Sequence, residues 1–431
     1  MPSEVDALIP YLDASVSPYH AVEQTRGRLL EAGFRELHER DAWELSAGDR
    51  VLTTRGGGSL AAFVIGDAQP AQAGFRLVGA HTDSPNLRIK PNADVKRDGY
   101  HQLAVESYGG VLLSTWMDRD LGIAGRVMLA GDAAQPTARL VNLDRPLARI
   151  PNLAIHLNRG VNKDGLKLNA QKHMVPIVGL QSSDGPSLAE LLAEALGTPG
   201  AKCSAEHIVG WDLGLYDLQG ASVAGVGGEF LHSGRLDNLA SCHAATEAIA
   251  QTAGRRDTTL GIVLYDHEEV GSQSAQGAQS TFLPDCLHRI SSACGGDADA
   301  LQRAVAHSFL ISADMAHALH PNYSDRHEPG HQPVLGGGPV LKSHAGQAYA
   351  TDGESGARFA LLCRNAGVPL QRFVSRSDLG CGSTIGPISA ARLGLRTVDV
   401  GSPLLSMHSA REMAATADVA MMQRVLAAHF A

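Results

Sequence analysis

Short apolar runs recur along the chain, and each one closes at a polar or glycine-rich stretch. They are FRLVGA (75–80), TTLGIVLY (258–265), HSFLISA (307–313) and LRTVDV (395–400). None of them alternates cleanly between apolar and polar positions. Such dense runs are typical of strands in a parallel sheet that is covered on both faces. We therefore predict four buried, mainly parallel strands.

Helical periodicity lies between and after these runs. The segments 238–253, 355–367 and 409–430 place apolar residues at helical spacing. In the last segment, Ser409 is followed three residues later by Glu412, which is the spacing of a capping box at a helix start. Strands that alternate with helices predict an α/β doubly wound fold.

The middle of the chain has a different pattern. Between residues 86 and 225, short β-like pieces such as AVESYGGVLL, GIAGRVML and KLNAQKHMVPIVGL predominate, and 186–197 is the main helical segment. We interpret 86–225 as a mainly β domain inserted into the α/β domain. The α/β domain is then discontinuous and consists of residues 1–85 and 226–431.

Histidines and carboxylates follow the predicted strands at the points where those strands end. In open parallel sheets, binding sites form outside the carboxyl ends of the strands, so these residues are expected to converge. Two histidines with several carboxylates form a ligand set that suits zinc, cobalt or manganese. The residues are His81, Asp83, Glu268, Glu269, Asp314 and His408, together with Asp237, which is predicted at the start of a helix.

The adjacent glutamates Glu268 and Glu269 suggest a division of labour. On an extended segment, neighbouring side chains point to opposite sides, so the two would not easily bind one ion together. One glutamate can then bind metal while the other acts as the general base that hydrolysis needs. His81 and Asp83 lie two residues apart, a spacing that suits a ligand histidine steadied by a carboxylate.

Ordinary structural roles compete with each of these interpretations. Taken alone, a glutamate pair is more often a solvated turn. His317 and His320 have helical spacing and are candidate ligands, although histidines near a strand end are more often structural. The segment HEPGH (327–331) reads as a solvated loop.

Two further patterns carry little chemistry. Cys381 and Ser383 suggest a nucleophile, but the chain contains no GxSxG sequence. The glycines of LGGGPV (335–340) fit neither GxGxxG nor a phosphate loop, so we expect a tight turn before a strand.

Composition excludes several classes of protein. The chain has 431 residues, 44% hydrophobic and 19% charged, with 36 Lys plus Arg against 45 Asp plus Glu and a formal net charge of −9. This charge argues against nucleic acid or an anionic membrane as a partner. No apolar run is long enough to span a bilayer, and the N-terminus does not resemble a signal peptide. Six cysteines without paired spacing indicate reduced thiols, so a cytoplasmic location is expected.

Taken in order, these motifs resemble the aspartyl aminopeptidase family of dizinc exopeptidases. The resemblance extends from the first predicted strand to the last helix, and IPNLAIHLNR (150–159) in the inserted segment belongs to it. The motifs are GAHTDSP (79–85), GRLDNLAS (234–241), DHEEVGS (266–272), SADMAHALHPNY (312–323), GSTIGP (382–387) and MHSAREM (407–413).

The resemblance implies two zinc ions per subunit, which cobalt or manganese can replace. One ion is expected on His81 and Asp314, and the other on Glu269 and His408. Asp237 is expected to bridge the two ions.

The resemblance also assigns roles around this metal centre. Glu268 is expected to be the general acid/base, and Asp83 the partner that steadies a ligand histidine. His156 is expected near the substrate, and metal binding by His156 is the less favoured alternative. Lys342 is expected to recognise an acidic substrate residue, and Met407 to line the same pocket.

The implied fold is a zinc-peptidase-like mixed sheet sandwiched by helices, with the inserted domain driving dimerisation and assembly into a tetrahedral dodecamer. The implied activity is removal of the N-terminal residue from peptides, with preference for Asp or Glu. Alternatives are a preference for neutral or apolar residues, or another dimetal hydrolase such as a carboxypeptidase or amide deacylase. A non-catalytic metal-binding protein would not need the spare Glu268.

Overall fold

The computed structural model describes residues 3–131, 135–182, 185–197 and 203–431. The chain forms two compact units. The first contains residues Met1–Asp83, Ala221–Met407 and Glu412–Ala431, and the second contains Ser84–Gly220 and His408–Arg411. We describe each unit separately.

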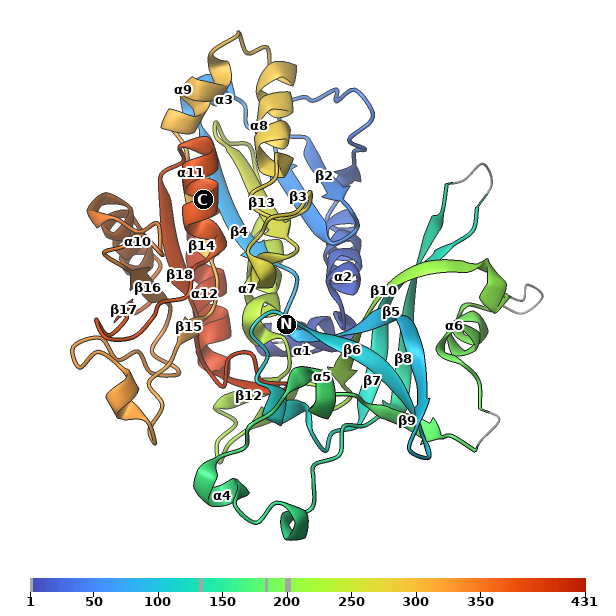
Figure 1. Cartoon of the computed structure of the whole chain (residues 1–431). Coiled ribbons are helices and arrows are strands. Elements are labelled where there is room, and N and C mark those ends of the chain that lie inside the picture. The colour runs from blue at the N-terminus through green and yellow to red at the C-terminus, as the bar shows by residue number, and fades with distance from the viewer. Residues whose placement is uncertain (1–2, 132–134, 183–184, 198–202) are drawn as a thin grey trace. The chain divides into compact units, whose positions relative to one another are not determined.

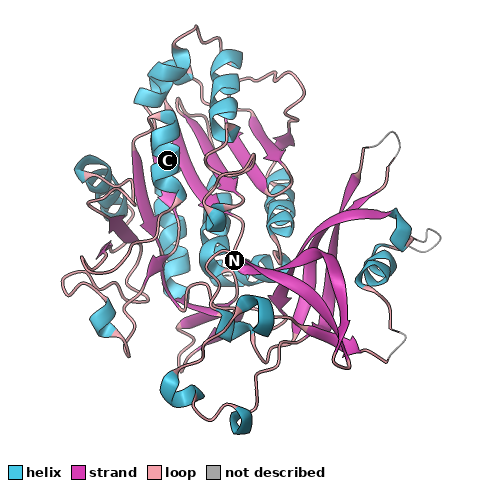
Figure 2. Cartoon of the chain, viewed as in Figure 1, coloured by secondary structure: helices cyan, strands magenta, loops and turns pink. Residues whose placement is uncertain are grey.

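The first unit is built on a mixed sheet of nine strands (Figures 1 and 2). Four neighbouring strands, β13, β4, β14 and β18, are parallel to one another. Antiparallel pairs flank them on both sides, and the outermost pair at each edge is parallel. The strand order is β1 (Arg35–Glu36), β2 (Arg50–Arg55), β3 (Ser59–Val64), β13 (Thr259–Tyr265), β4 (Phe75–His81), β14 (Phe309–Ala313), β18 (Thr397–Gly401), β16 (Val340–Ser343) and β17 (Gln371–Val374).

Helices cover both faces of this sheet. The first unit contains α1 (Glu4–Ala14), α2 (Pro18–Glu31), α3 (Pro70–Ala73), α7 (Leu236–Ala250), α8 (Phe282–Ala293), α9 (Ala300–Ala306), α10 (Gly353–Asn365), α11 (Ile385–Leu393) and α12 (Thr416–Phe430). One apolar core joins a sheet face to α1, α2, α7, α10 and α12, and a second core joins the other face to α8, α9 and α11.

Alternate residues of the central strands enter the two cores. In β13, Ile262 and Leu264 lie in the first core while Val263 and Tyr265 lie in the second. Because both faces are covered, every residue of β13 is buried. This explains the dense apolar run, and it confirms the α/β prediction with a mixed sheet between helices.

A smaller sheet of five strands belongs to the same unit. Its order is β11 (Ser222–Ala224), β12 (Phe230–Ser233), β20 (Glu412–Ala415), β19 (Pro403–Leu405) and β15 (Ala316–His317). It corrects the predicted helix 409–430, because the helix begins only at Thr416 and residues 412–415 form β20. Pairing with β12 and β19 outweighs the helical propensity of this alanine-rich stretch, so the predicted capping box of Ser409 and Glu412 is wrong.

The second unit is an antiparallel sheet with one longer helix. Its order is β8 (Thr137–Ala148), β7 (Leu121–Leu129), β10 (Ile208–Asp217), β5 (Asn86–Arg97), β6 (Tyr100–Tyr108) and β9 (Ile177–Leu180). Helix α6 (Leu188–Leu196) packs in its core, and α4 (Val161–Asp164) and α5 (Ala170–His173) are single turns. The predicted β piece KLNAQKHMVPIVGL therefore contains α5 before β9 begins.

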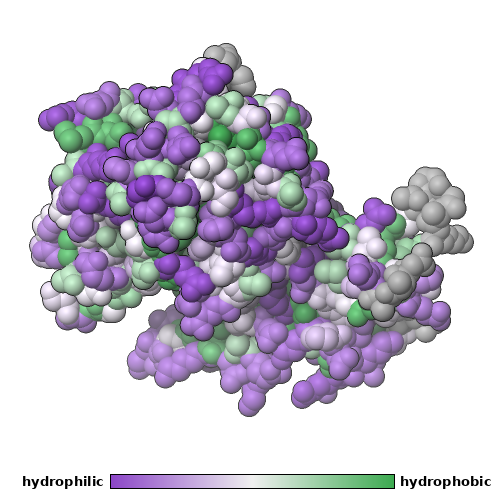
Figure 3. Space-filling model, turned by 90° about the horizontal axis from the view of Figure 1, so that it is seen from above, coloured by the Kyte–Doolittle hydropathy of each residue, from purple (hydrophilic) through white to green (hydrophobic). Residues whose placement is uncertain are grey.

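Hydrophilic residues predominate on the face shown in Figure 3, where hydrophobic residues gather only in small groups. All six cysteines are free, as the sequence predicted. Within the described part of the chain, no helix combines the length and apolar character needed to cross a membrane.

Candidate metal centre

Three neighbouring parallel strands deliver candidate ligands to one edge of the large sheet. His81 is the last residue of β4, Asp314 follows β14, and the acidic segment from Asp266 to Glu269 follows β13. Tyr265 of β13 is directly opposite His81 in the parallel register. The carboxyl ends of these strands therefore meet where the sequence predicted a site.

Carboxylates surround the His81 ring. Its Nε2 atom lies 3.4 Å from Oδ1 of Asp237 and 3.4 Å from Oδ1 of Asp314. The ligand atoms of these three buried residues all lie within 4.8 Å of one another, and His81, Glu268 and Glu269 form a second set with the same property. Residues more than 230 positions apart in the sequence thus meet around one imidazole.

Asp83 contacts both the histidine and the glutamate pair. The Nδ1 atom of His81 lies 3.0 Å from the backbone carbonyl oxygen of Asp83 and 3.5 Å from its carboxylate. The same carboxylate accepts hydrogen bonds of 3.1 Å from the backbone N–H groups of Glu268 and Glu269. Asp83 therefore fixes the backbone of the acidic pair as well as the orientation of the ring.

The backbone of the glutamate pair differs from the sequence prediction. Residues Glu268–Val270 form the 3₁₀ helix η5, which follows His267 at φ 64° and precedes Gly271 at φ 90°. The premise of an extended segment with oppositely directed side chains is therefore wrong. Neighbouring side chains of a 3₁₀ turn point about 120° apart and not to opposite sides. Ligand atoms of Glu268, Glu269 and His81 accordingly all lie within 4.8 Å of one another.

Buried negative charge accumulates at this site. Burial raises the pKa of Glu268 to about 8, and the nearby aspartates add to this increase while His81 opposes it. Burial and the nearby carboxylates likewise raise the pKa of Glu269 well above its ordinary value. Hydrogen bonding to carboxylates raises the pKa of His81, although burial disfavours its charged form.

Buried carboxylates this close together need protons or cations to offset their mutual repulsion. A donor set of histidine nitrogen and carboxylate oxygens at this spacing fits zinc. The residues present thus meet the requirements of a metal centre.

The histidine predicted from MHSAREM lies in a short connecting segment. His408 follows Met407 and belongs by its contacts to the second unit, where its Nδ1 atom lies 3.1 Å from the carbonyl oxygen of Gly110. The chain returns to the first unit at Glu412, whose carboxylate accepts a 3.1 Å hydrogen bond from the backbone N–H of Asp237.

Lys342 is buried. Its side chain is 2% exposed, and its Nζ donates a 3.1 Å hydrogen bond to the carbonyl oxygen of Met315. The same Nζ lies 3.6 Å from Oδ2 of Asp314 and 5.2 Å from the centre of the Tyr349 ring. Lys342 is also the only lysine within the sequence of the first unit. Lys342 is therefore not an ordinary surface lysine.

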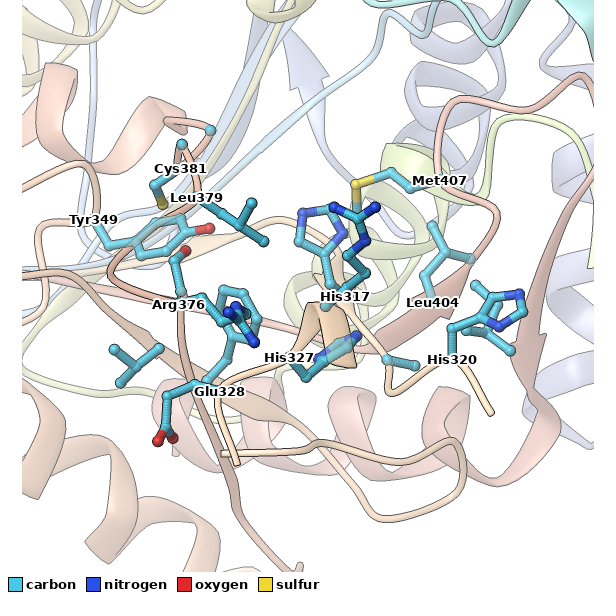
Figure 4. A pocket seen from close by; sticks show the side chains of 18 of the residues that line it. His317, His320, His327, Glu328, Tyr349, Arg376, Leu379, Cys381, Leu404 and Met407 are labelled. Carbon is cyan, nitrogen blue, oxygen red and sulfur yellow. The ribbon is translucent and has the colours of Figure 1, made fainter. Parts of the chain in front are cut away.

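A pocket of about 320 Å³ opens beside Tyr349 in the first unit (Figure 4). His317 and His320 line it, as do His327 of the HEPGH loop and Met407. His317 lies in the two-residue strand β15, so the helical spacing considered for His317 and His320 is wrong. Among the described residues, neither belongs to a cluster with metal-ligand spacing.

Sequence reasoning missed part of this pocket. Tyr349 and Phe373 lie in its wall with Cys381, and Figure 4 shows Cys381 beside the ring of Tyr349. No motif identifies these aromatic residues, because they come from separate segments that only the fold unites. By contrast, LGGGPV is a turn before β16, as predicted, with Gly336 and Gly338 at positive φ.

His156 lies in the second unit. It belongs to the 3₁₀ helix η3 (Ile155–Leu157), and its neighbours Ile155 and Leu157 are 49% and 75% exposed. Its predicted place near substrate stays a prediction.

The α/β fold and this donor set define the class of a metal-dependent hydrolase. The family described as "Aminopeptidase I zinc metalloprotease (M18)" matches residues 11–430. The chain belongs to this M18 family of zinc aminopeptidases, enzymes that hydrolyse peptides at the N-terminus.

Relatives match over nearly their whole length. The chain is 47% identical over 425 residues to "Probable M18 family aminopeptidase 2" of Pseudomonas paraeruginosa, covering 98% of this chain and 97% of the relative. It is 48% identical over 429 residues to the protein of the same name from Streptomyces avermitilis, covering 98% and 96%.

Solved structures share the fold. A cryo-EM structure of the Ape4 and Nbr1 complex contains a chain with a TM-score of 0.95 and 38% identity, covering 99% of this chain and 85% of that one. The crystal structure of prApe1 has a TM-score of 0.91 and 30% identity, covering 99% and 93%. A structure of the S. cerevesiae mApe1 dodecamer has a TM-score of 0.85 and 28% identity, covering 99% and 95%.

Proposed function

We propose that this aminopeptidase uses two zinc ions and prefers peptides with an acidic N-terminal residue. The observation that carries the two-ion proposal is the number of donors gathered around His81, which shares sets of metal-ligand spacing with Asp237, Asp314 and Glu269. A catalytic zinc ion typically takes three protein ligands and keeps one position open, so these donors exceed what one ion needs even when Glu268 is left free as the base.

In this proposal, His81 and Asp314 hold one ion, Glu269 and His408 hold the other, and Asp237 is shared. The distances around His81 support the first set. His408 is supported by its position in the chain, because Glu412, four residues later, is hydrogen-bonded to Asp237. Cobalt and manganese accept the same donor types.

The bound ions would supply a Lewis acid and lower the pKa of water. Glu268 is the proposed general base, since it lies 4.0 Å from His81 and its pKa is already raised by burial. It takes a proton from the attacking water and then donates it to the leaving amine. Asp83 holds Glu268 in place through the backbone N–H.

Lys342 supports the acidic preference. Its buried ammonium lies 3.6 Å from Oδ2 of the candidate ligand Asp314 and 5.2 Å from the ring centre of the pocket residue Tyr349, so it places a positive charge next to both. A specific observation favours the alternative of neutral residues: burial lowers the pKa of His317 and His327, so these pocket histidines add no charge near neutral pH.

Assembly is proposed from the relatives. We infer that residues 86–225 form an inserted domain that mediates dimerisation and a tetrahedral dodecamer, since a mApe1 dodecamer shares the fold. His156 is proposed to lie near the substrate. We further infer peptide substrates, no nucleic-acid or membrane partner, and a cytoplasmic location.

Metal analysis tests the two-ion proposal. Purified protein is expected to contain two zinc ions per chain, to lose peptide hydrolysis on chelation, and to regain it with zinc, cobalt or manganese. A single ion per chain in fully active protein contradicts the proposal.

Substrate comparison tests the specificity. Cleavage of matched peptides that begin with Asp, Glu or Leu is expected to favour the acidic pair. The Lys342→Met variant should lower the Asp/Leu ratio of kcat/KM by about 10- to 100-fold, as expected for a lost hydrogen bond between charged groups. The control Lys96→Met changes an exposed lysine of β5 and should leave the ratio unchanged. An unchanged ratio in Lys342→Met contradicts the role of Lys342.

A further inference from the structure

Glu412 is a buried carboxylate in a strand, and the metal centre described above does not use it. Its exposed fraction is 2%, and it begins β20, directly opposite Ser233 of β12. Burying a carboxylate is unfavourable unless hydrogen-bond donors reach it. The donor identified here is the backbone N–H of Asp237, 3.1 Å from Oε2 of Glu412.

The helix that carries Asp237 lacks a side-chain cap of its own. At the start of α7, the N-cap residue Arg235 makes no side-chain capping bond and has φ 61°. Asp237 itself has the non-helical angles φ −83° and ψ 105°. The first N–H groups of a helix have no intrahelical acceptor, and a carboxylate at this end is favourable for both hydrogen bonding and charge.

We propose that Glu412 is a positioning residue for the metal centre: it caps α7 from another strand and thereby fixes the backbone of Asp237. Glu412 does not cap the helix predicted at 409–430; its carboxylate instead reaches the start of α7, which begins 176 residues earlier in the chain.

Glu412 follows the candidate ligand His408 by four residues in the sequence and accepts a hydrogen bond from the backbone of the candidate ligand Asp237. The inference rests on the proposed function, because it requires Asp237 to be a ligand. Partners that orient metal ligands typically change metal affinity by about 10- to 100-fold when they are removed.

The test measures zinc affinity of metal-free protein by competition with a chelating dye, so it does not depend on activity. Glu412→Ala is expected to bind zinc about 10- to 100-fold more weakly. Glu412→Gln keeps an acceptor oxygen at the same reach and should restore affinity close to that of the wild type. Glu412→Asp keeps the charge but shortens the reach, so its affinity should fall below that of Glu412→Gln.

The control variant is Glu247→Gln. Glu247 lies on the same helix α7, is 18% exposed and pairs with Arg28 at 2.7 Å. The Glu247→Gln variant should lower the thermal stability of the protein without changing its affinity for zinc.

Two outcomes overturn the proposal: wild-type zinc affinity in folded Glu412→Ala, or an affinity of Glu412→Asp equal to that of Glu412→Gln. If Glu412→Ala does not fold, the comparison of zinc affinity between Glu412→Asp and Glu412→Gln still tests the positioning role of Glu412. If the wild type binds a single ion, the two-ion proposal fails, whereas the effect of Glu412 on that ion's affinity still tests its role.

Discussion

The two units of this chain use strands in different ways, and the strand ends of the first unit bring candidate metal ligands together. In the first unit, β13, β4 and β14 are parallel neighbours, so their carboxyl ends bring Glu268, His81 and Asp314 to one edge. The strand pairs of the six-stranded sheet in the second unit are antiparallel, so successive carboxyl ends lie at opposite edges.

Burial differs in the same way. All seven residues of β13 and all five of β14 are buried, whereas β8 in the second unit is mostly exposed. Helices on both faces of the first sheet create a low-dielectric edge, and such surroundings shift the pKa values of ionisable groups. Parallel strands and double coverage therefore explain together why the chemistry concentrates in the first unit.

The largest expected effect follows from removing the proposed base. Glu268→Gln should lower kcat by about 10²- to 10⁴-fold, because the amide cannot accept the proton from water. Zinc content, measured on the same preparation, should stay near that of the wild type.

The same change in the antiparallel sheet is the matched control. Glu106 is an exposed residue of β6, and Glu106→Gln should leave kcat unchanged. Normal turnover in Glu268→Gln would show that the base has been assigned to the wrong residue.

Core substitutions should show that the large sheet is covered by helices on both faces whereas β8 of the second unit is mostly exposed. Leu310 in β14 is fully buried, and Leu310→Ala should lower the free energy of unfolding by about 2–5 kcal/mol because it leaves a cavity. Leu140 in β8 is 39% exposed, and Leu140→Ala should cost less than about 0.5 kcal/mol. Denaturant titration measures the free energy of unfolding of both variants. Equal decreases in the two variants would contradict the difference in burial between the two sheets.

A further expected effect concerns acid stability of the first unit. Burial lowers the pKa of His429, next to Phe309, to about 3. As pH falls below about 6.5, the unfolded chain binds this proton before the folded protein does. Neutral His429 therefore makes its full contribution to the free energy of unfolding above about pH 6.5. This contribution is lost as the pH falls towards 3.

Replacing His429 tests whether this residue makes the protein less stable as the pH falls. Between pH 6.5 and 4, the His429→Phe variant should lose stability less steeply than wild type, by about 1.4 kcal/mol per pH unit. Urea titrations across this range, compared with the difference at pH 8, measure the slope. An identical slope in both proteins would mean that His429 is protonated in the folded state.

The sequence alone determined the strands, several helices and the composition of the site. Dense apolar runs predicted β4, β13, β14 and β18, because double burial requires apolar residues at successive positions. The strand ends identified His81 and Asp314, since parallel strands end at a common edge. These features depend on local pattern, which a sequence records directly.

Only the tertiary structure decided the rest. Residues 412–415 form a strand because β12 and β19 pair with them, although their local pattern is helical. The conformation of Glu268–Val270, the burial of Lys342 and the contact of Glu412 with Asp237 likewise depend on distant segments. Spacing along a chain cannot show which distant partner satisfies a buried charge, because packing chooses that partner in space.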